Sequence, residues 1–151
     1  SAMTPTPPQA VPSFGSSAVA ATPSAQRIPA DFDTTAFLRI AKLNFVRLQA
    51  ANDARNFDDL REFLAPELFA EVKMQMEERG MAPQVTDVLS LNAELLEVVS
   101  EPSRHVASVR FSGMISESAG AAADSFDEVW NLVKPAAGNR GWQVAGIQQL
   151  S

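Results

Sequence analysis

The sequence predicts an α+β domain in which three N-terminal helices pack on one face of a four-stranded antiparallel sheet. The first observation behind this prediction is a change of hydrophobic period, which is helical up to Gly80 and alternating beyond it. The second is the position of turn-forming residues at 101–104 and 138–141, which divide the alternating part into hairpins. The third is a compositional boundary near residue 30, which separates a proline-rich segment from a part long enough to bury a core.

Residues 1–30 differ in composition from the rest of the chain. They hold six of the ten prolines, and Pro, Ala, Ser and Thr together fill 21 of the 30 positions. Such a segment buries too little apolar surface to offset the entropy of ordering, so we expect a linker. Ser1-Ala2-Met3 is interpreted as a cloning scar. The expected organisation is a linker over 1–30 and a folded domain over 31–151, preceded in the native protein by further sequence.

A capping residue and apolar spacing predict the first helix. Asp33 is a suitable N-cap for a helix from about Thr34 to Ala51. Its apolar stripe consists of Phe37, Ala41, Phe45 and Leu48, widened by Leu38 and Ile40. Three basic residues lie off this stripe, namely Arg39, Lys42 and Arg47. We interpret them as a solvated polar face, with contact to anionic lipid as the alternative.

Two further helices are expected before the alternating part begins. Asn-Phe-Asp-Asp at 56–59 resembles a capping box and opens a short helix through Phe63. Pro66 suits the first position of a third helix, and Gly80 suits its C-terminal cap. The buried face of the third helix is expected to consist of Leu68, Phe69, Val72 and Met76. We interpret Met74, Met76 and Met81 as core residues, with an adaptable binding surface as the alternative.

Four strands are expected in the second half of the chain. The first presents one apolar face made of Leu89, Leu91, Ala93, Leu95 and Val99. The second carries Val109, Phe111 and Ile115 on one face, and Gly113 interrupts it, which indicates a bulge or a bend. Residues 125–134 form the third strand, and the turn at 138–141 leads into the last one at 142–149.

Several segments resemble a known family of domains. The N-terminal string is Ile-Pro-Ala-Asp-Phe-Asp at 28–33, followed by Phe-Leu at 37–38 and Ala-Lys at 41–42. The strands contribute Val-Arg-Phe-Ser-Gly at 109–113, Phe-Asp-Glu-Val-Trp at 126–130 and Trp-Gln-Val-Ala-Gly-Ile-Gln-Gln at 142–149. Together these segments resemble the bacterial Tim44-like domains, which are relatives of the C-terminal domain of a motor subunit of the mitochondrial inner-membrane translocase. The resemblance covers about residues 28–151.

The resemblance implies a fold, a location and a type of function. The fold is a cone of helices and curved sheet, similar to nuclear transport factor 2-like folds, around an apolar cavity. The location is the inner membrane, where an anchor upstream of this sequence would hold the domain on one side or the other.

The net charge of the domain weighs against direct contact with anionic headgroups. Arg27 is the only charged residue of 1–30, so the remainder carries a formal net charge of −7, against −6 for the whole chain. Basic residues near such a surface each contribute about 1 kcal/mol, so contact through the cavity or a tether is expected instead.

Composition excludes several classes of function. Cysteine and tyrosine are absent and His105 is the one histidine, which excludes disulfides, thiol nucleophiles and histidine-clustered metal sites. The acidic balance argues against a nucleic-acid surface. The sequence also lacks phosphate-binding glycine loops and the Gly-x-Ser-x-Gly elbow. We therefore expect neither a cofactor nor a metal ion.

An enzyme remains an alternative, because nuclear transport factor 2-like cones also house isomerases and dehydratases. Such sites need a carboxylate or histidine base in an apolar pocket and a donor for the developing oxyanion. Glu128 is the best candidate base, since alternation places it on the face of Phe126 and Trp130. The favoured interpretation is an ion pair with Arg110 across the sheet, or a place at the cavity mouth. His105 follows a turn and is expected to face solvent.

The sequence therefore favours a non-enzymatic binding module near the inner membrane, linked to protein translocation or membrane-protein assembly. It would hold lipid or an apolar peptide segment in a cavity. The candidate lining residues are Phe37, Phe45, Leu48, Phe111, Glu128, Trp130 and Trp142. The alternatives are an isomerase- or dehydratase-type enzyme and a scaffold that forms a homodimer through the exposed face of the sheet. An oriented donor beside Glu128 would favour the enzyme, and an apolar outer sheet face would favour the scaffold. A protein partner is also expected, and nucleic acid is not.

Overall fold

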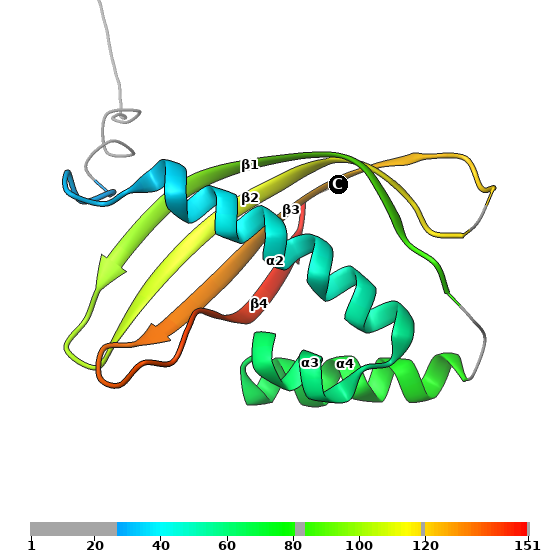
Figure 1. Cartoon of the computed structure of the whole chain (residues 1–151), viewed down its shortest axis with the longest axis horizontal. Coiled ribbons are helices and arrows are strands. Elements are labelled where there is room, and N and C mark those ends of the chain that lie inside the picture. The colour runs from blue at the N-terminus through cyan, green and yellow to red at the C-terminus, as the bar shows by residue number, and fades with distance from the viewer. Residues whose placement is uncertain (1–26, 81–83, 119, 151) are drawn as a thin grey trace, which may run out of the picture.

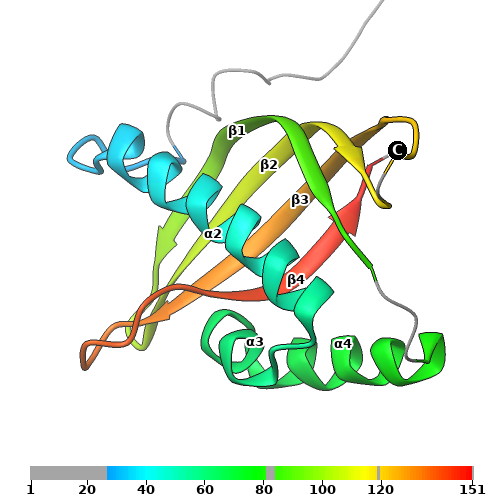
Figure 2. The same cartoon turned by 45° about the vertical axis from the view of Figure 1, so that its right-hand side comes forward.

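The computed structural model describes residues 27–80, 84–118 and 120–150. The described residues form three helices followed by a four-stranded antiparallel sheet, which confirms the expected α+β class. Helix α2 crosses the concave face of the sheet, and α3 and α4 lie beside the last strand, β4 (Figures 1 and 2). This arrangement agrees with the cone of helices and curved sheet that the resemblance implies. The cloning scar and residues 4–26 of the expected linker lie outside the described residues.

Helix α2 spans Thr34–Ala54 and begins as the sequence predicts. The Asp33 carboxylate accepts the backbone N–H of Ala36 at 3.1 Å and so satisfies a donor of the first turn. The helix continues past the expected end near Ala51 and stops at Arg55, which has a left-handed conformation with φ of 55°. Its buried face consists of Phe37, Ala41, Phe45, Leu48 and Ala51.

Helix α3 spans Phe57–Phe63 and α4 spans Pro66–Arg79. The side-chain oxygen of Asn56 accepts the backbone N–H of Asp59 at 3.2 Å, so the expected cap of α3 is present. Proline stands in the first turn of α4, where a missing N–H costs no intrahelical hydrogen bond. Gly80 ends α4 with φ of 76°, a conformation that residues with a Cβ adopt rarely. The local signals in the sequence therefore place both helices correctly.

The methionines of α4 divide between the core and the surface. Of the expected buried face, Leu68 and Met76 are buried, while Phe69 and Val72 pack partly exposed against the core. Met74 is 59% exposed. Met81 lies outside the described residues. The core interpretation is therefore right for Met76 and wrong for Met74, because two positions along a helix turn a side chain to the opposite side.

The sheet has the order β1-β2-β3-β4, and neighbouring strands are antiparallel. The strands span Asp87–Ser100 in β1, Arg104–Ser116 in β2, Asp124–Pro135 in β3 and Gln143–Gln149 in β4. A short turn joins β1 to β2 and a longer loop over 136–142 joins β3 to β4, at the places where the sequence predicts hairpins. Strand β3 is longer than expected by one residue at each end, and β4 begins one residue later than expected.

Two irregularities in β1 overturn part of its predicted apolar face. Leu89 and Val99 were expected to face the interior, but they are 58% and 41% exposed, whereas Val98 is buried. The register of β1 against β2 shifts within 88–90 and again within 95–97. Each shift adds a residue to one strand and so reverses which side chains face inward. The predicted face is correct only between the two shifts.

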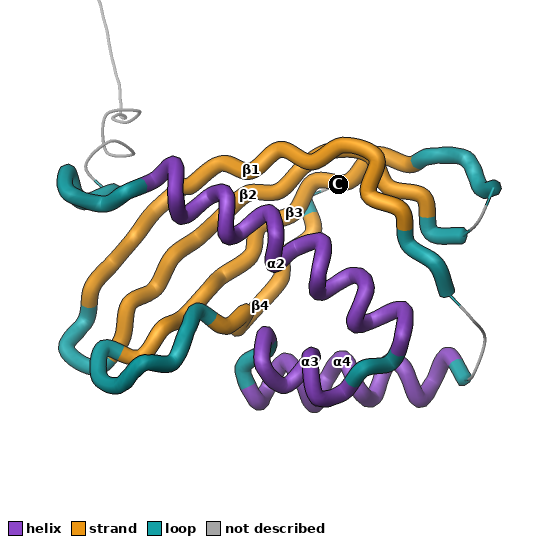
Figure 3. The backbone as a smooth tube through the Cα atoms, in the orientation of Figure 1, coloured by secondary structure: helices purple, strands orange, loops and turns teal. Residues whose placement is uncertain are grey.

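Gly113 marks a close approach between β2 and β1. A Cβ at this position would overlap the carbonyl oxygen of Ser90, so a residue with a side chain does not fit without displacing β1. Gly113 pairs with Leu91, directly beside the first register shift of β1. The irregularity that the sequence predicts at this glycine is therefore found on the partner strand. The sheet as a whole arches over α2 (Figure 3).

The core lies between α2 and the concave face of the sheet. The ring of Phe45 lies 4.8 Å from that of Phe111 and 4.9 Å from that of Trp130, measured between centroids. Phe37 meets Trp142 edge-on at 5.3 Å. The apolar stripe of the helix thus contacts the sheet mainly through aromatic rings, as the sequence predicts.

Arg27, the first described residue, contacts the sheet. Its carbonyl oxygen accepts the N–H of Val98 at 2.9 Å, and its guanidinium pairs with Glu97 at 2.8 Å. Ile28 and Phe32 pack against the core while partly exposed. The last residues of the expected linker therefore contact the edge strand β1.

Candidate ligand pocket

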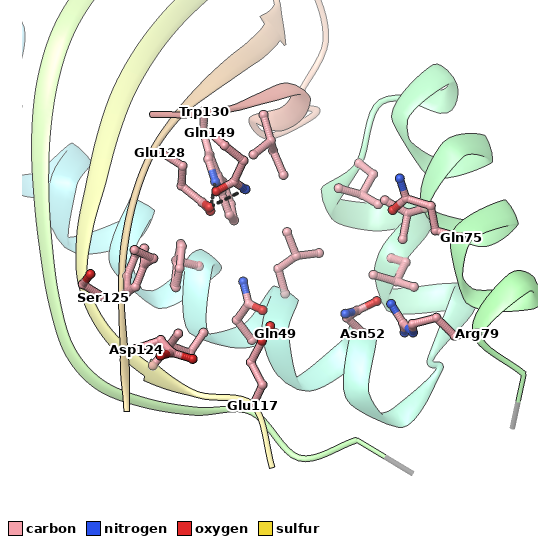
Figure 4. Close-up of a pocket in the computed structure, with 18 residues that line it drawn as sticks. Gln49, Asn52, Gln75, Arg79, Glu117, Asp124, Ser125, Glu128, Trp130 and Gln149 are labelled. Atoms are coloured by element: carbon pink, nitrogen blue, oxygen red, sulfur yellow. Dashed lines mark hydrogen bonds between the residues drawn. The ribbon is translucent and has the colours of Figure 1, made fainter. Parts of the chain in front are cut away.

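A pocket of about 350 Å³ lies between α2, α4 and the sheet (Figure 4). This volume is within the range of small-ligand sites, which is roughly 300–1,000 Å³. The lining consists of Phe45, Leu48, Gln49, Asn52, Leu60, Leu64, Val72, Gln75, Arg79, Ile115, Glu117, Asp124, Ser125, Phe126, Glu128, Trp130, Ile147 and Gln149.

The inner wall of the pocket is apolar and largely aromatic. Phe45 stacks on Phe126 with ring centroids 5.4 Å apart, and on Trp130 at 4.9 Å. Leu60 and Leu64 are fully buried and close the wall beside α3. An apolar group of a ligand would lose its contact with water against this wall, which favours binding.

Amide side chains and one arginine surround the apolar wall. Gln49 and Asn52 come from α2, Gln75 and Arg79 from α4, and Gln149 from β4 (Figure 4). A side-chain amide offers two N–H donors and one carbonyl acceptor. The pocket therefore combines an apolar wall with groups that can hydrogen-bond the polar part of a ligand.

Acidic residues exceed basic ones around the pocket. The lining contains Glu117, Asp124 and Glu128, against Arg79 as its one basic residue within the described part of the chain. No group of three His, Asp or Glu side chains among the described residues is placed to hold a metal ion. The excess of carboxylates therefore gives the pocket a negative formal charge.

Glu128 is the buried acid of the lining, with 9% of its surface exposed. One carboxylate oxygen accepts the indole N–H of Trp130 at 2.7 Å, and the other accepts an amide N–H of Gln149 at 2.9 Å. Trp130 lies two residues further along β3 on the same face, and Gln149 is the partner of Glu128 in the register with β4. These bonds hold the carboxylate at the pocket wall (Figure 4).

The expected ion pair between Glu128 and Arg110 is wrong. Arg110 donates two hydrogen bonds to Asp127, at 2.8 and 2.6 Å. The physical reason is strand alternation, which turns Asp127 to the outer face of the sheet with Arg110 and turns Glu128 to the inner face. The hydrogen bonds from Arg110 lower the pKa of Asp127 below its ordinary value.

Glu128 has two donors within hydrogen-bond reach, which is a feature expected of the enzyme alternative. Both donors are directed at the Glu128 carboxylate itself. A donor for an oxyanion has to point at the place where charge develops on the substrate. His105 is half-buried, shares a hydrogen bond of 2.9 Å with Ser100 and lies outside the pocket lining. The geometry therefore positions a carboxylate, and the N–H groups bonded to it point at Glu128 itself.

The seven predicted lining residues separate into three groups. Phe45, Leu48, Glu128 and Trp130 line the pocket, while Phe111, Trp142 and again Trp130 line a second cavity of about 20 Å³. Phe37 lines neither cavity, because it is buried between Phe32 and Trp142, with both ring centroids 5.3 Å away. Whether these residues bind a ligand stays a prediction.

The polar part of the lining was missed in the sequence. Gln49 follows Phe45 by four residues, and Asn52 follows Leu48 by four residues. This spacing places each amide on the same helical face as an inward aromatic or aliphatic residue. An amide four residues after a core residue on the same helix therefore indicates a pocket mouth, and the sequence contains this pattern twice.

The described residues form a small α+β domain in which helices and a curved antiparallel sheet enclose a pocket. A family model described as the Tim44-like domain matches residues 18–149 of the sequence. The chain belongs to the Tim44-like domain family. None of the curated protein sequences matches the chain significantly.

Family membership indicates a membrane-associated module related to protein translocation. Domains of this family are generally non-catalytic. Among the described residues, none of the helices is long and apolar enough to cross a membrane.

Proposed function

We propose that this domain is a non-enzymatic binding module in protein translocation or membrane-protein assembly, held at the inner membrane by an anchor elsewhere in the protein. Its ligand is an apolar polypeptide segment, bound in the pocket between α2, α4 and the sheet. The observation that carries this proposal is the pocket itself, which is lined both by stacked aromatic rings and by four amide side chains.

The amides are the reason to prefer a peptide over an acyl chain. Gln49, Asn52, Gln75 and Gln149 offer donors and acceptors that match the N–H and C=O groups of a peptide backbone. A hydrocarbon chain would displace water from the partly buried amides of Gln49 and Asn52 without offering them a hydrogen-bond partner, which costs free energy. A lipid acyl chain is therefore the alternative ligand.

The outer face of α2 supports contact with a membrane surface. Ile40, Leu43 and Val46 are 54%, 65% and 47% exposed and fall on one side of the helix. Arg39 and Lys42 are exposed beside them, where the sequence favoured a purely solvated face. Exposed apolar residues with basic neighbours are typical of helices that lie on anionic membranes. This local patch offsets part of the repulsion expected from the acidic domain.

Filling the pocket tests the proposed ligand site. Val72 lines the pocket from α4, whereas Met74 is exposed on the opposite side of the same helix. We expect Val72→Phe to weaken binding of a short apolar peptide about tenfold or more, because the added ring occupies the ligand's volume. Met74→Phe is the matched control and should leave binding unchanged. Binding is measured from the fluorescence of Trp130 in a Trp142→Phe background, which leaves one tryptophan.

The same titration with lauric acid distinguishes the two ligand classes. The proposal is supported if the peptide binds and Val72→Phe weakens this binding. Binding of lauric acid without binding of the peptide contradicts it and assigns the pocket to acyl chains. Equal losses in Val72→Phe and Met74→Phe would show that the pocket is not the binding site.

The oriented carboxylate of Glu128 is the observation that favours an isomerase- or dehydratase-type enzyme as a second candidate function. A general base is effective only when a substrate proton lies within hydrogen-bond reach of it. Turnover of a cone-fold substrate that falls about 100-fold in Glu128→Gln would establish this candidate.

Dimerisation through the sheet has weaker support than the pocket. The middle of the outer face carries the Arg110–Asp127 ion pair and a hydrogen bond of 2.9 Å from Ser108 to Asn131. Leu89 is exposed near one end of the same sheet. Sedimentation equilibrium decides whether the chain forms the dimer that the scaffold hypothesis requires.

A further inference from the structure

We propose that the pocket selects a primary ammonium group on an aliphatic stem, with Glu128 as its counter-ion, and that its occupant is a lysine side chain of the bound peptide. A free alkylamine shares this chemistry. The inference rests on the proposed function, because it takes the same pocket as the ligand site. It adds the requirement that the ligand carry a positive charge as well as an apolar part.

Glu128 is a buried carboxylate without a cationic partner. It is 9% exposed, and none of the ion pairs among the described residues includes it. A carboxylate has about four acceptor positions, of which Trp130 and Gln149 fill one on each oxygen. Acceptor positions therefore remain on a group that lines the pocket. An ammonium group would occupy them through charge-assisted hydrogen bonds, which are stronger than those of neutral donors.

The other charges around the pocket favour the same ligand. Glu117 and Asp124 add two carboxylates to the lining. Arg79 is the one basic side chain that lines the pocket within the described residues, and it lies across the pocket from Glu128 (Figure 4). The pocket therefore attracts a ligand with a positive charge. It repels a fatty-acid carboxylate, because its three acidic side chains outweigh the one arginine.

The apolar wall accommodates the stem that carries the ammonium group. Phe45 and Leu48 line the pocket from α2, and Leu60 and Leu64 close it beside α3. Lysine side chains commonly bury their methylene groups against apolar surface while the charged end meets a polar partner. The pocket offers both surfaces at once, because Glu128 and the ring of Phe45 belong to the same lining.

Three unbranched probes with six carbon atoms each isolate the contribution of charge. They are hexylamine, 1-hexanol and hexanoate, used near neutral pH, where an alkylamine is protonated. We expect hexylamine to bind about tenfold or more tightly than 1-hexanol, because it forms a charge-assisted pair. Hexanoate should bind more weakly than both.

Two variants on adjacent residues test the role of Glu128. Glu128→Gln keeps the size of the side chain and an acceptor for the indole N–H of Trp130, but removes the charge. It should lower the affinity for hexylamine to that for 1-hexanol and leave 1-hexanol unchanged. Asp127→Asn is the matched control, because this carboxylate lies on the outer face with Arg110. It should leave the binding of all three probes unchanged.

The indole N–H of Trp130 provides a direct readout by NMR. The chain has two tryptophans, and Trp142→Phe leaves one indole signal. Hexylamine should shift this signal saturably, because the indole shares the Glu128 carboxylate with the ammonium group. The same spectra show whether Glu128→Gln is folded. If that variant does not fold, the order of affinity of the three probes and the saturable shift decide the question.

A pair of peptides distinguishes a side chain from a free amine. One peptide carries a central lysine between apolar residues, and the other carries norleucine at that position, which keeps the stem without the ammonium group. About tenfold tighter binding of the lysine peptide, lost in Glu128→Gln, supports the proposal. A preference for hexylamine without a preference for the lysine peptide upholds the ammonium site and overturns its assignment to a peptide.

Two outcomes separate the failure of this inference from the failure of the proposed function. Equal binding of hexylamine and 1-hexanol would overturn the charge requirement, while binding of 1-hexanol would still uphold an apolar ligand site. A lack of binding by every probe and by both peptides would contradict the inference and the proposed function together.

Discussion

Asp127 and Glu128 are neighbours in β3, yet their carboxylates have different surroundings. Asp127 faces the outer side of the sheet and accepts two hydrogen bonds from the guanidinium of Arg110. Glu128 faces the pocket and accepts hydrogen bonds from the neutral donors of Trp130 and Gln149. Because a strand turns successive side chains to opposite faces, one position along the chain decides between a surface ion pair and a pocket carboxylate.

The Arg110–Asp127 pair predicts how stability depends on pH. Hydrogen bonds from Arg110 lower the pKa of Asp127 in the folded protein, whereas an unfolded aspartate titrates near its ordinary value of about 3.9. A carboxylate whose pKa is lowered by folding stabilises the fold above its unfolded pKa, and this contribution is lost as the pH falls through the folded pKa. Asp127→Asn should therefore be less stable than the wild type near neutral pH, and the difference should disappear in strong acid.

Urea unfolding of both proteins at neutral pH and at several acidic pH values measures this difference. Arg110→Gln is the control, because it removes the same pair from the other side and should abolish the same pH dependence. A difference in stability between wild type and Asp127→Asn that stays constant down to strong acid would contradict the assignment.

The face of Glu128 was predictable from the sequence, but its partners were not. Alternation along β3 places Glu128 with Phe126 and Trp130 whatever the neighbouring strands do. Gln149 reaches the carboxylate only because β3 and β4 pair in one particular register, which sequence periodicity does not specify. The expected ion pair with Arg110 was wrong because alternation turns Arg110 to the outer face of the sheet, where Asp127 occupies its guanidinium.

At the scale of elements, local signals predicted where the helices begin and failed where strands pair irregularly. Asp33 and Asn56 cap their helices with hydrogen bonds that span three residues, so a short stretch of sequence contains both partners. The exposure of Leu89 and Val99 depends on register shifts between β1 and β2. Such shifts are properties of a pair of strands, so the alternation within β1 alone predicts the wrong face.

Gly113 is the element-scale position most sensitive to substitution. A Cβ there would overlap the carbonyl oxygen of Ser90 on the neighbouring strand, and backbone atoms cannot move aside without breaking the pairing of β1 and β2. We expect Gly113→Ala to lower the free energy of unfolding by more than about 1 kcal/mol, which exceeds the ordinary effect of a glycine-to-alanine change. Urea denaturation measures the loss.

Gly141 provides the matched control for this substitution. It lies in the β3–β4 loop with open space where a Cβ would be, so Gly141→Ala should change the stability by less than about 0.5 kcal/mol. Equal effects of the two substitutions would show that the close approach of β1 and β2 at Gly113 does not limit the side chain there.

At the scale of the whole molecule, the pocket depends on how the helical half is joined to the sheet. Asp53, near the end of α2, accepts hydrogen bonds from the backbone N–H and the hydroxyl of Thr86, directly before β1. The N–H of Ala65 bonds the carbonyl oxygen of Val144 on β4 at 2.8 Å, which holds α4 against the opposite edge. Both contacts join segments far apart in sequence. The aromatic wall was predictable from periodicity, but the assembly of amides from several elements was not.

The N-terminal part of the domain provides a final test of where the folded unit begins. Residues 1–26 lack apolar periodicity, so a chain starting at Arg27 should unfold with the same free energy as the full chain, within about 0.5 kcal/mol. A chain starting at Asp31 also loses the hydrogen bond from Val98, the exposed ion pair with Glu97 and the partial burial of Ile28. These losses together should cost about 1–3 kcal/mol, most of it from the backbone hydrogen bond and the isoleucine, because exposed ion pairs contribute little. Urea unfolding of the three chains at one pH measures both steps. Equal stability of the two shortened chains would show that the contacts of Arg27 and Ile28 with β1 do not stabilise the fold.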